Sequence, residues 1–237
     1  MNDFWENQVD PGYYDEILLN GLKKKSGIQS NWHNLTFLKI AKKINSESNH
    51  LDYACGPGTF IGNYLKSESL GVDISEQQIE YANNQYSEFG TFMTTGEFKL
   101  ENYFETYDVI TVIGLLEFIT KDEAIKLTDD LYPLLKPGGK IFITTPNYRG
   151  LMYLLEKLVN LFGDVNYQNQ HISRYNKSNI KKILEKSSFK EVKVKKIINL
   201  GVSFSIFNHN MGKVVEKFIE RLFNNFFGFI LLVELKK

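Results

Sequence analysis

A glycine loop lies in the sequence HLDYACGPGTFIG, residues 50–62. Gly56 and Gly58 carry no side chains, so a ligand can approach the backbone closely where a strand turns into a helix. This chemistry suits a nucleotide-like cofactor. The dinucleotide fingerprint needs a third glycine at position 61, where this chain has Ile61. A nicotinamide-dependent oxidoreductase is therefore the weaker of the cofactor hypotheses.

The elements around this loop alternate between strand-type and helix-type runs, which is typical of crossover units on a parallel sheet. Apolar spacing predicts strands at 50–54, 69–73, 90–94, 107–114, 139–145, 189–198 and 228–235. It predicts helices at 58–67, 75–85, 122–136, 151–163, 177–187 and 211–223. We therefore expect an α/β fold, a doubly wound (Rossmann-like), mostly parallel seven-stranded sheet with helices on both faces and inserted helices after strands five and six. Ligands bind at the carboxyl ends of the strands in such sheets.

The length fits one domain over residues 1–237. We expect an N-terminal helical lid at 1–48, a cofactor-binding core at 49–145, and substrate-side insertions with the last two strands at 146–237.

The stretch LDYACGPG resembles motif I of the class I methyltransferases that use S-adenosyl-L-methionine. That motif is an acid followed by alternating glycines, matched here by Asp52, Ala54, Gly56 and Gly58. Ala54 replaces the first glycine and leaves slightly less room beside the methionine moiety. The resemblance implies that this loop binds S-adenosyl-L-methionine.

Further motifs of that family follow in the same order. Asp73 in GVDIS stands where the family has an acid that accepts hydrogen bonds from both ribose hydroxyls, and Ile74 is implied to pack on the adenine. Glu97 in TTGEFKL matches an acid near the adenine amino group. YDVITVIGLLEFI resembles the fourth strand, which places Gly114 beside the sulfonium, and LLKPGGKIFITTPN resembles the turn before strand five. The resemblance covers about residues 48–198.

The layout also resembles the small-molecule branch that contains ubiquinone-type O-methyltransferases. It implies methyl transfer to a small-molecule acceptor, at oxygen, of quinone-like, glycan or lipid-linked type. A Pro-Pro-Tyr element for amino acceptors is missing, because the chain has IGLLEF after strand four, and Cys55 lies in the cofactor loop rather than in a nucleophilic position. Both absences argue against nucleic acid as the acceptor.

An oxygen acceptor benefits from a base, and histidine titrates near neutral pH. His171, expected in a loop at the mouth of the site, and His33, in the N-terminal segment, are the candidates. The alternative for each is a structural hydrogen bond or packing role. Phe118 follows Glu117 where many relatives have histidine, so Glu117 is expected only to cap the next turn. This departure keeps open a non-catalytic module that binds the cofactor and regulates or scaffolds a partner.

Composition limits the remaining possibilities. The 28 basic and 28 acidic residues balance, which does not favour a polyanionic partner. The single cysteine excludes a disulfide framework and a multi-cysteine zinc site, and it suits a protein of the reducing cytoplasm. Methyl transfer from a sulfonium requires no metal, so we expect no metal site. The first residues are acidic and polar and do not resemble a secretion signal, so we expect no export. The longest apolar stretch is about half of a membrane-spanning helix, so we expect no transmembrane segment.

Two surface patterns allow more than one interpretation. The helix at 211–223 is predicted to pack its apolar side on the protein; the alternative is that this side, with Phe204, Phe207, Phe226 and Phe227, makes a peripheral membrane contact or a dimer. The lysines at 181, 182, 186, 190, 193, 195 and 196 are interleaved with acids and are expected to form a solvated face. The sequence leaves the oligomeric state open.

Overall fold

The computed structural model describes residues 9–65, 67–149 and 171–237. The helix expected at 151–163 lies outside these residues. The α-helices are α2 (Tyr13–Lys24), α3 (Ile28–Ala41), α4 (Thr59–Tyr64), α5 (Glu76–Tyr86), α6 (Lys121–Leu131), α8 (Lys177–Leu184) and α9 (His209–Phe223). The strands are β1 (His50–Tyr53), β2 (Ser69–Asp73), β3 (Gly90–Thr94), β4 (Tyr107–Ile113), β5 (Leu135–Pro146), β6 (Glu191–Ile197) and β7 (Ile230–Lys236). Short 3₁₀ helices are η1 (Leu100–Tyr103), η2 (Leu116–Phe118), η3 (Tyr132–Leu134) and η4 (Leu200–Ile206).

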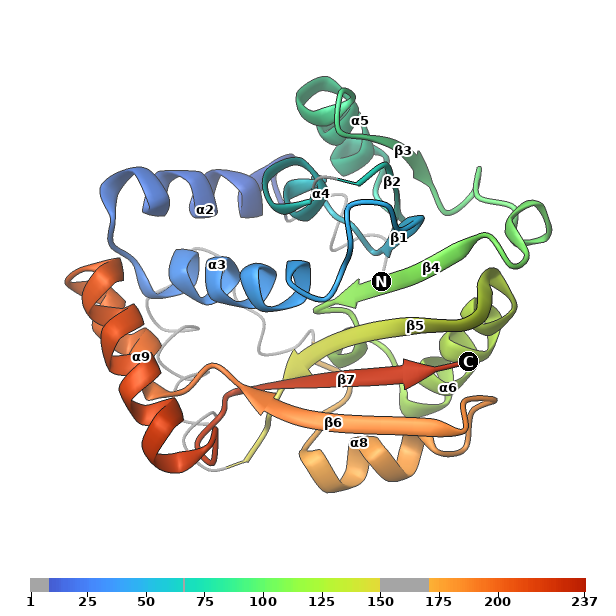
Figure 1. Ribbon diagram of the computed structural model, residues 1–237. Coiled ribbons are helices and arrows are strands. Elements are labelled where there is room, and N and C mark those ends of the chain that lie inside the picture. The colour runs from blue at the N-terminus through green and yellow to red at the C-terminus, as the bar shows by residue number, and fades with distance from the viewer. Residues whose placement is uncertain (1–8, 66, 150–170) are drawn as a thin grey trace.

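The seven strands form one sheet in the order β3-β2-β1-β4-β5-β7-β6, as Figure 1 shows. The first five strands pair in parallel, whereas β7 runs antiparallel to both β5 and β6. The strand order reverses at β1, which has β2 as its neighbour on one side and β4 on the other. This confirms the predicted doubly wound, mostly parallel sheet, and its ligand edge is the carboxyl end of β1 and its neighbours.

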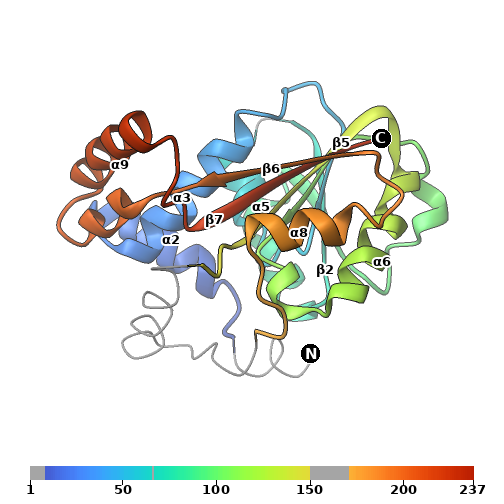
Figure 2. The same cartoon turned by 90° about the horizontal axis from the view of Figure 1, so that it is seen from below.

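Helices cover both faces of the sheet (Figure 2). One apolar cluster joins the sheet to α3, α4 and α5 through residues such as Ile40, Phe60 and Ile79. The other joins it to α6 and α8 through residues such as Ala124 and Ile180. The central strands are therefore buried on both sides, which explains why β2 reads as a continuous run with all five residues buried.

Local signals in the sequence set several helix ends. Ser75 caps α5, its hydroxyl accepting a hydrogen bond from the backbone N–H of Gln78 at 3.3 Å. Thr120 and Glu123 form a capping box at the start of α6. The helix expected at 122–136 ends at Leu131 and continues as η3, because Pro133 has no N–H to extend the ladder.

The turn expected before strand five lies inside that strand. Tyr107 of β4 pairs with Leu135, and Val109, two residues on, pairs with Lys140. The residues between form an irregularity in which Gly138 has a φ of 81°. The turn was thus correctly located, but the prediction that it separates a helix from a strand beginning at residue 139 was wrong. Pairing with β4 begins at Leu135, before the turn.

The described part of the N-terminal segment contains the helices α2 and α3. Ile40 of α3 is fully buried in the core, and the ring of Trp32 stacks on Phe229 with centroids 6.0 Å apart. Upstream of α2, the carbonyl oxygen of Asp10 accepts a hydrogen bond from the Gln78 side chain at 3.1 Å. Gln78 lies in the first turn of α5, just beyond the carboxyl end of β2, so this part of the chain reaches the ligand edge of the sheet. Its role as a lid stays a prediction.

Candidate functional site

The carboxyl ends of three adjacent strands bring the main predicted residues to one edge of the sheet. Ala54 follows β1, Asp73 ends β2, and Gly114 follows β4. The strands pair in register, with Asp52 of β1 opposite Gly71 on one side and Thr111 on the other. Segments up to about sixty residues apart in sequence therefore meet at this edge.

The loop after β1 has a left-handed backbone at three alternate residues. Ala54, Gly56 and Gly58 have φ values of 64°, 53° and 75°. A Cβ added to Gly56 would meet nothing within 4 Å, whereas one added to Gly58 would lie 2.7 Å from the ring of Phe92. The second glycine therefore packs against the protein, and the first borders open space that a ligand can occupy.

Asp73 is tied directly to this loop. Its Oδ2 accepts a hydrogen bond from the backbone N–H of Gly56 at 2.8 Å, and its Oδ1 accepts one from that of Ser75 at 3.0 Å. Carboxylate oxygens each have two acceptor positions, so an acid held in this way is suited to a diol. The next residue, Ile74, is 39% exposed, so its side chain can make an apolar contact with a flat ring.

Asp52 lies beneath the loop. Its side chain is buried, and its Oδ1 accepts a hydrogen bond from the Thr111 hydroxyl at 2.5 Å. Burial raises the pKa of Asp52 to about 7; the Thr111 hydrogen bond opposes this rise, and the nearby charge of Asp73 adds to it. The observed contact joins β1 to β4, so Asp52 positions the strand ends. Its direct contact with a cofactor stays a prediction.

Glu97 closes the turn after β3. Its Oε2 accepts hydrogen bonds from the backbone N–H of Thr94 at 2.8 Å and from the Thr94 hydroxyl at 2.9 Å. These two hydrogen bonds lower the pKa of the Glu97 carboxyl. These hydrogen bonds already explain an acid at this position, because they hold the turn together. The expected contact of Glu97 with the adenine stays a prediction.

Glu117 lies at the same edge of the sheet, in a different role from the cap that the sequence predicts. Rather than capping the next turn, a role that Thr120 and Glu123 fill, it is buried with its Oε2 accepting a hydrogen bond from the Thr145 hydroxyl at 2.8 Å. Its Oε1 lies 3.7 Å from the position of a Cβ on Gly114. Burial raises the pKa of Glu117 to about 7. A carboxylate within the apolar run IGLLEFI was the available signal.

His171 is brought to the same place by the backbone of Glu117. The carbonyl oxygen of Glu117 accepts hydrogen bonds from the N–H groups of Ile172 and Ser173 at 2.8 and 3.1 Å. The ring of His171 then lies 5.2 Å from that of Phe118, between centroids, and its Nδ1 is 2.8 Å from the Tyr148 hydroxyl. Tyr148, which follows strand five, was not singled out from the sequence.

His33 has different surroundings. Its ring lies 5.8 Å from that of Tyr14 and 5.9 Å from that of Phe37, between centroids, in the aromatic packing of α2 and α3. Burial lowers the pKa of His33 to about 4, which makes it a weak base. His50 and His209 are buried and hydrogen-bonded, His50 to Ser69 and Thr111 and His209 to Ser30. These contacts give both histidines structural roles.

A seven-stranded sheet in this order, with a glycine loop after β1 and an acid at the end of β2 tied to it, defines the class I methyltransferase fold. A family model described as a methyltransferase domain matches residues 30–194, more than half of the chain. The chain belongs to this methyltransferase domain family, and the predicted class I family is confirmed.

Curated relatives agree with this assignment. The chain is 29% identical over 122 residues to a ubiquinone biosynthesis O-methyltransferase of Vibrio cholerae, covering 47% of this chain and 49% of that protein. It is 26% identical over 152 residues to the enzyme of the same name from Aliivibrio fischeri, covering 60% and 63%. The chain thus spans about half of the length of the first relative.

Solved structures show the same fold. A methyltransferase from Archaeoglobus fulgidus, described as dependent on S-adenosylmethionine, matches with a TM-score of 0.62 at 19% identity, covering 92% of this chain and 98% of that one. A magnesium protoporphyrin IX methyltransferase from Synechocystis, with the demethylated cofactor product bound, matches with a TM-score of 0.57 at 15% identity, covering 100% and 97%. The predicted cofactor, S-adenosyl-L-methionine, is confirmed together with the family.

Proposed function

We propose that this protein transfers a methyl group from S-adenosyl-L-methionine to an oxygen atom of a small-molecule acceptor, a phenolic, quinone-like compound in the first instance. The names of the curated relatives support this acceptor class over the glycan and lipid-linked alternatives. The expected location in the cytoplasm stays a prediction from the sequence.

The residues at the carboxyl edge fit the cofactor. The open side of Gly56, the carboxylate of Asp73 and the exposed side chain of Ile74 suit an adenosyl group, and Gly114 with the loop after β4 would border the methionine part. When bound, S-adenosyl-L-methionine supplies a methyl group on a positively charged sulfur. The task left to the protein is to align the acceptor oxygen, exclude water and take up its proton.

His171 is the group proposed to take that proton. The observation that carries this assignment is its position beside Phe118, held there by the backbone of Glu117 and by the Tyr148 hydroxyl. The hydrogen bond to Nδ1 fixes the orientation of the imidazole ring, which is what a base needs in order to meet an acceptor. His33, the other candidate, lies among aromatic rings and has a lowered pKa.

The test has two stages. Titration calorimetry with S-adenosylmethionine and its demethylated product, with NAD as control, measures the cofactor; a panel of phenols, catechols and sugars then measures transfer of a labelled methyl group. His171→Asn should leave cofactor affinity unchanged and lower kcat by about 10²–10⁴. Tyr148→Phe should lower kcat less, since it removes only the orienting hydrogen bond.

The outcomes separate the alternatives. A large loss of kcat in His33→Asn, together with a normal kcat in His171→Asn, would mean that His33 of α3 is the base. Cofactor binding without transfer to any member of the panel would favour the non-catalytic module. Binding of NAD alone would overturn the cofactor assignment.

A further inference from the structure

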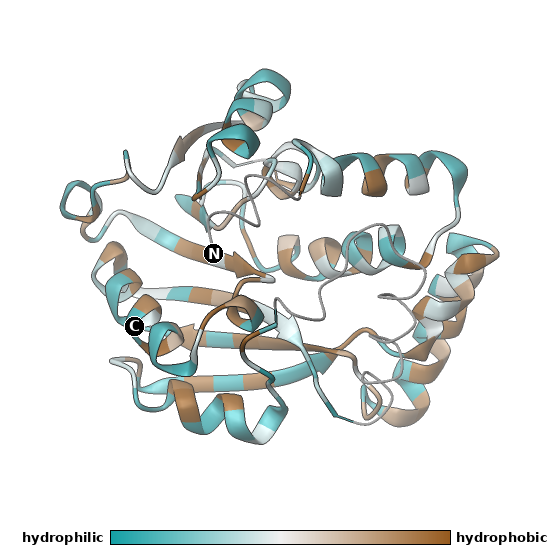
Figure 3. Cartoon of the chain, turned by 180° about the vertical axis from the view of Figure 1, so that it is seen from behind, coloured by the Kyte–Doolittle hydropathy of each residue, from teal (hydrophilic) through white to brown (hydrophobic). Residues whose placement is uncertain are grey.

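Helix α9 turns its apolar side away from the protein. Val214, Phe218 and Leu222 recur at helical spacing and are 68%, 62% and 60% exposed. The prediction that this side packs on the protein was therefore wrong. Figure 3 shows hydrophobic residues along α9 at the margin of the molecule.

The orientation of α9 is fixed by polar contacts on its inner side. The Oε1 of Glu216, a buried residue, accepts hydrogen bonds from the backbone N–H and the side-chain amide of Asn199 at 2.6 and 3.0 Å. His209 at the start of the helix lies 3.0 Å from the Ser30 hydroxyl, between Nε2 and Oγ. Rotating α9 to bury its apolar side would expose these groups and break their bonds, so the outward apolar side belongs to the fold.

More exposed apolar side chains adjoin this stripe. The ring of Phe227 contacts those of Phe223 and Phe226, with centroids 5.4 and 5.1 Å apart, at the end of the helix and just after it. We call the combined surface the outer apolar face; it comprises Phe207, Met211, Val214, Phe218, Leu222, Phe223 and Phe226. An exposed group of this size marks an interaction site.

The charges around the outer apolar face are positive. The acids of α9 point elsewhere, since Glu216 is buried and Glu220 pairs with Lys39 of α3 at 3.1 Å. The cations of the helix, Lys213, Lys217 and Arg221, lie on its accessible sides. An apolar stripe bordered by cations is the pattern of a helix that lies in the plane of a membrane interface.

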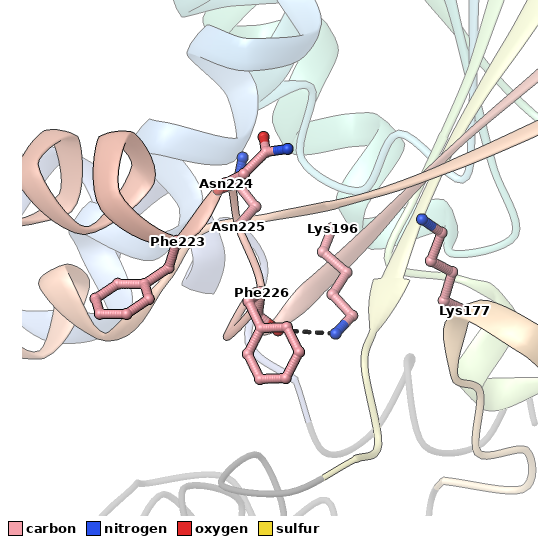
Figure 4. Close-up of a pocket in the computed structure, with 6 residues that line it drawn as sticks. All are labelled: Lys177, Lys196, Phe223, Asn224, Asn225 and Phe226. Carbon is pink, nitrogen blue, oxygen red and sulfur yellow. Dashed lines mark hydrogen bonds between the residues drawn. The ribbon is translucent and has the colours of Figure 1, made fainter.

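A hollow next to Phe226 adds further cations (Figure 4). Lys177, Lys196, Phe223 and Phe226 are among the residues that line it. The Nζ of Lys196 donates a hydrogen bond to the carbonyl oxygen of Phe226 at 2.8 Å and lies 5.2 Å from the centroid of its ring. Partial burial lowers the pKa of Lys196, and the nearby charges of Arg149 and Lys177 lower it further, so several cations converge here. The other lysines of its run are exposed, as expected, and Lys196 is half-buried.

We propose that the outer apolar face docks on the surface of an anionic lipid bilayer, with the hollow at Lys177 and Lys196 receiving lipid phosphate. A second copy of the chain is the poorer occupant. A two-fold interface would bring Lys213, Lys217 and Arg221 of both copies together, whereas anionic headgroups complement them. No helix in the described ranges 9–65, 67–149 and 171–237 could cross a membrane, and the proposed contact is peripheral.

The position of α9 relates this contact to the site. Strand β6 leads through η4 into α9, so the helix lies beyond the carboxyl end of β6 (Figure 1). The backbone N–H of Gly27 donates to the carbonyl oxygen of Ser205 at 2.7 Å, which joins η4 to the turn before α3. Docking through α9 would hold the ligand edge of the sheet near the bilayer.

Vesicle co-sedimentation of the full chain tests the proposal without any catalytic readout. Binding should be strong to vesicles of phosphatidylcholine with phosphatidylglycerol, weak to phosphatidylcholine alone, and reduced by salt. The double variant Phe218→Ser, Leu222→Ser should bind the mixed vesicles at least about tenfold more weakly. Lys177→Gln with Lys196→Gln should lose roughly tenfold on the mixed vesicles and little on the neutral ones.

Matched controls lie at the other side of the molecule. Phe104→Ser removes a ring that is 57% exposed just before β4, and Lys190→Gln removes an exposed cation before β6; both should bind vesicles like the wild type. Unchanged thermal unfolding and cofactor titration would show that the variants fold. Equal binding by the Phe218/Leu222 variant, or a dimer that this variant converts to a monomer while vesicles are ignored, would overturn the proposal.

Discussion

The backbone N–H of Gly56 donates a hydrogen bond to Oδ2 of Asp73 at 2.8 Å, so the glycine loop after β1 and the acid that ends β2 hold one another. Parallel pairing of β1 with β2 makes this contact available, because their carboxyl ends lie side by side. The carboxylate is thereby oriented before any ligand arrives, and an oriented acceptor loses less entropy on binding.

Asp73→Asn should weaken binding of S-adenosylmethionine by at least about tenfold, because hydrogen bonds to a charged acceptor contribute roughly 1.5–3 kcal/mol each. Calorimetric titration measures the change. Asn has nearly the same shape but only one acceptor oxygen, so it can keep only one of the hydrogen bonds from the N–H groups of Gly56 and Ser75. Asp122→Asn, an acid in the first turn of α6, is the control and should bind like the wild type. Wild-type affinity in Asp73→Asn would remove this residue from the cofactor site.

Ala54→Gly should stabilise the fold. Ala54 has a φ of 64°, where an L-residue with a side chain costs about 1–2 kcal/mol. Glycine removes that strain but has more freedom in the unfolded chain, which offsets about 0.4–1 kcal/mol. The net gain should lie between zero and about 1.6 kcal/mol, seen as a higher urea midpoint at constant m-value.

The matched change is Ala124→Gly, at a buried position inside α6. Here glycine has no backbone strain to relieve, so it should destabilise by about 1 kcal/mol or more. A loss of stability in both variants would mean that Ala54 is not strained.

Glu117→Gln should become more stable relative to the wild type as the pH rises. Burial raises the pKa of Glu117 from 4.5 to about 7, so the folded state holds its proton more tightly than the unfolded state does. The contribution of the Glu117 carboxyl to the free energy of unfolding is fully present below pH 4.5 and is lost as the pH rises through about 7. The difference in urea midpoint between variant and wild type should grow across this window and level off above it.

Glu123→Gln provides a contrast of opposite sign. Hydrogen bonds from the backbone and hydroxyl of Thr120 lower the pKa of Glu123, so its contribution is present above the unfolded pKa and fades as the pH falls. Glu123→Gln should be less stable than the wild type at neutral pH, and this difference in stability should shrink toward low pH. Parallel pH profiles for the two variants would contradict the buried environment of Glu117.

Local sequence patterns accounted for much of the fold. The runs SLGVD and GTFMT gave strands with the expected ends, since β2 and β3 match the predicted ranges. Ser75 caps α5 through a hydrogen bond with Gln78, three residues further along the chain. Such features depend on neighbours within a few residues, and that is why the sequence alone reveals them.

The acceptor side of the site could not be predicted in the same way. Tyr148 and His171 meet across 23 residues, and Glu117 meets Thr145 across 28. No spacing rule connects these pairs. Their contact follows from β5 lying beside β4, which sets the loops after both strands next to each other.

The sequence by itself determined the family, the order of the core elements and the glycine loop with its partner acid, because motif spacing and apolar periodicity are local properties of the chain. Only the tertiary structure decided which histidine lies beside the loop after β4, that Glu117 is buried with a raised pKa, and that α9 faces its apolar side outward. Periodicity defines two sides of a helix, but the hydrogen bonds of Glu216 and His209 with distant residues choose the side that is buried.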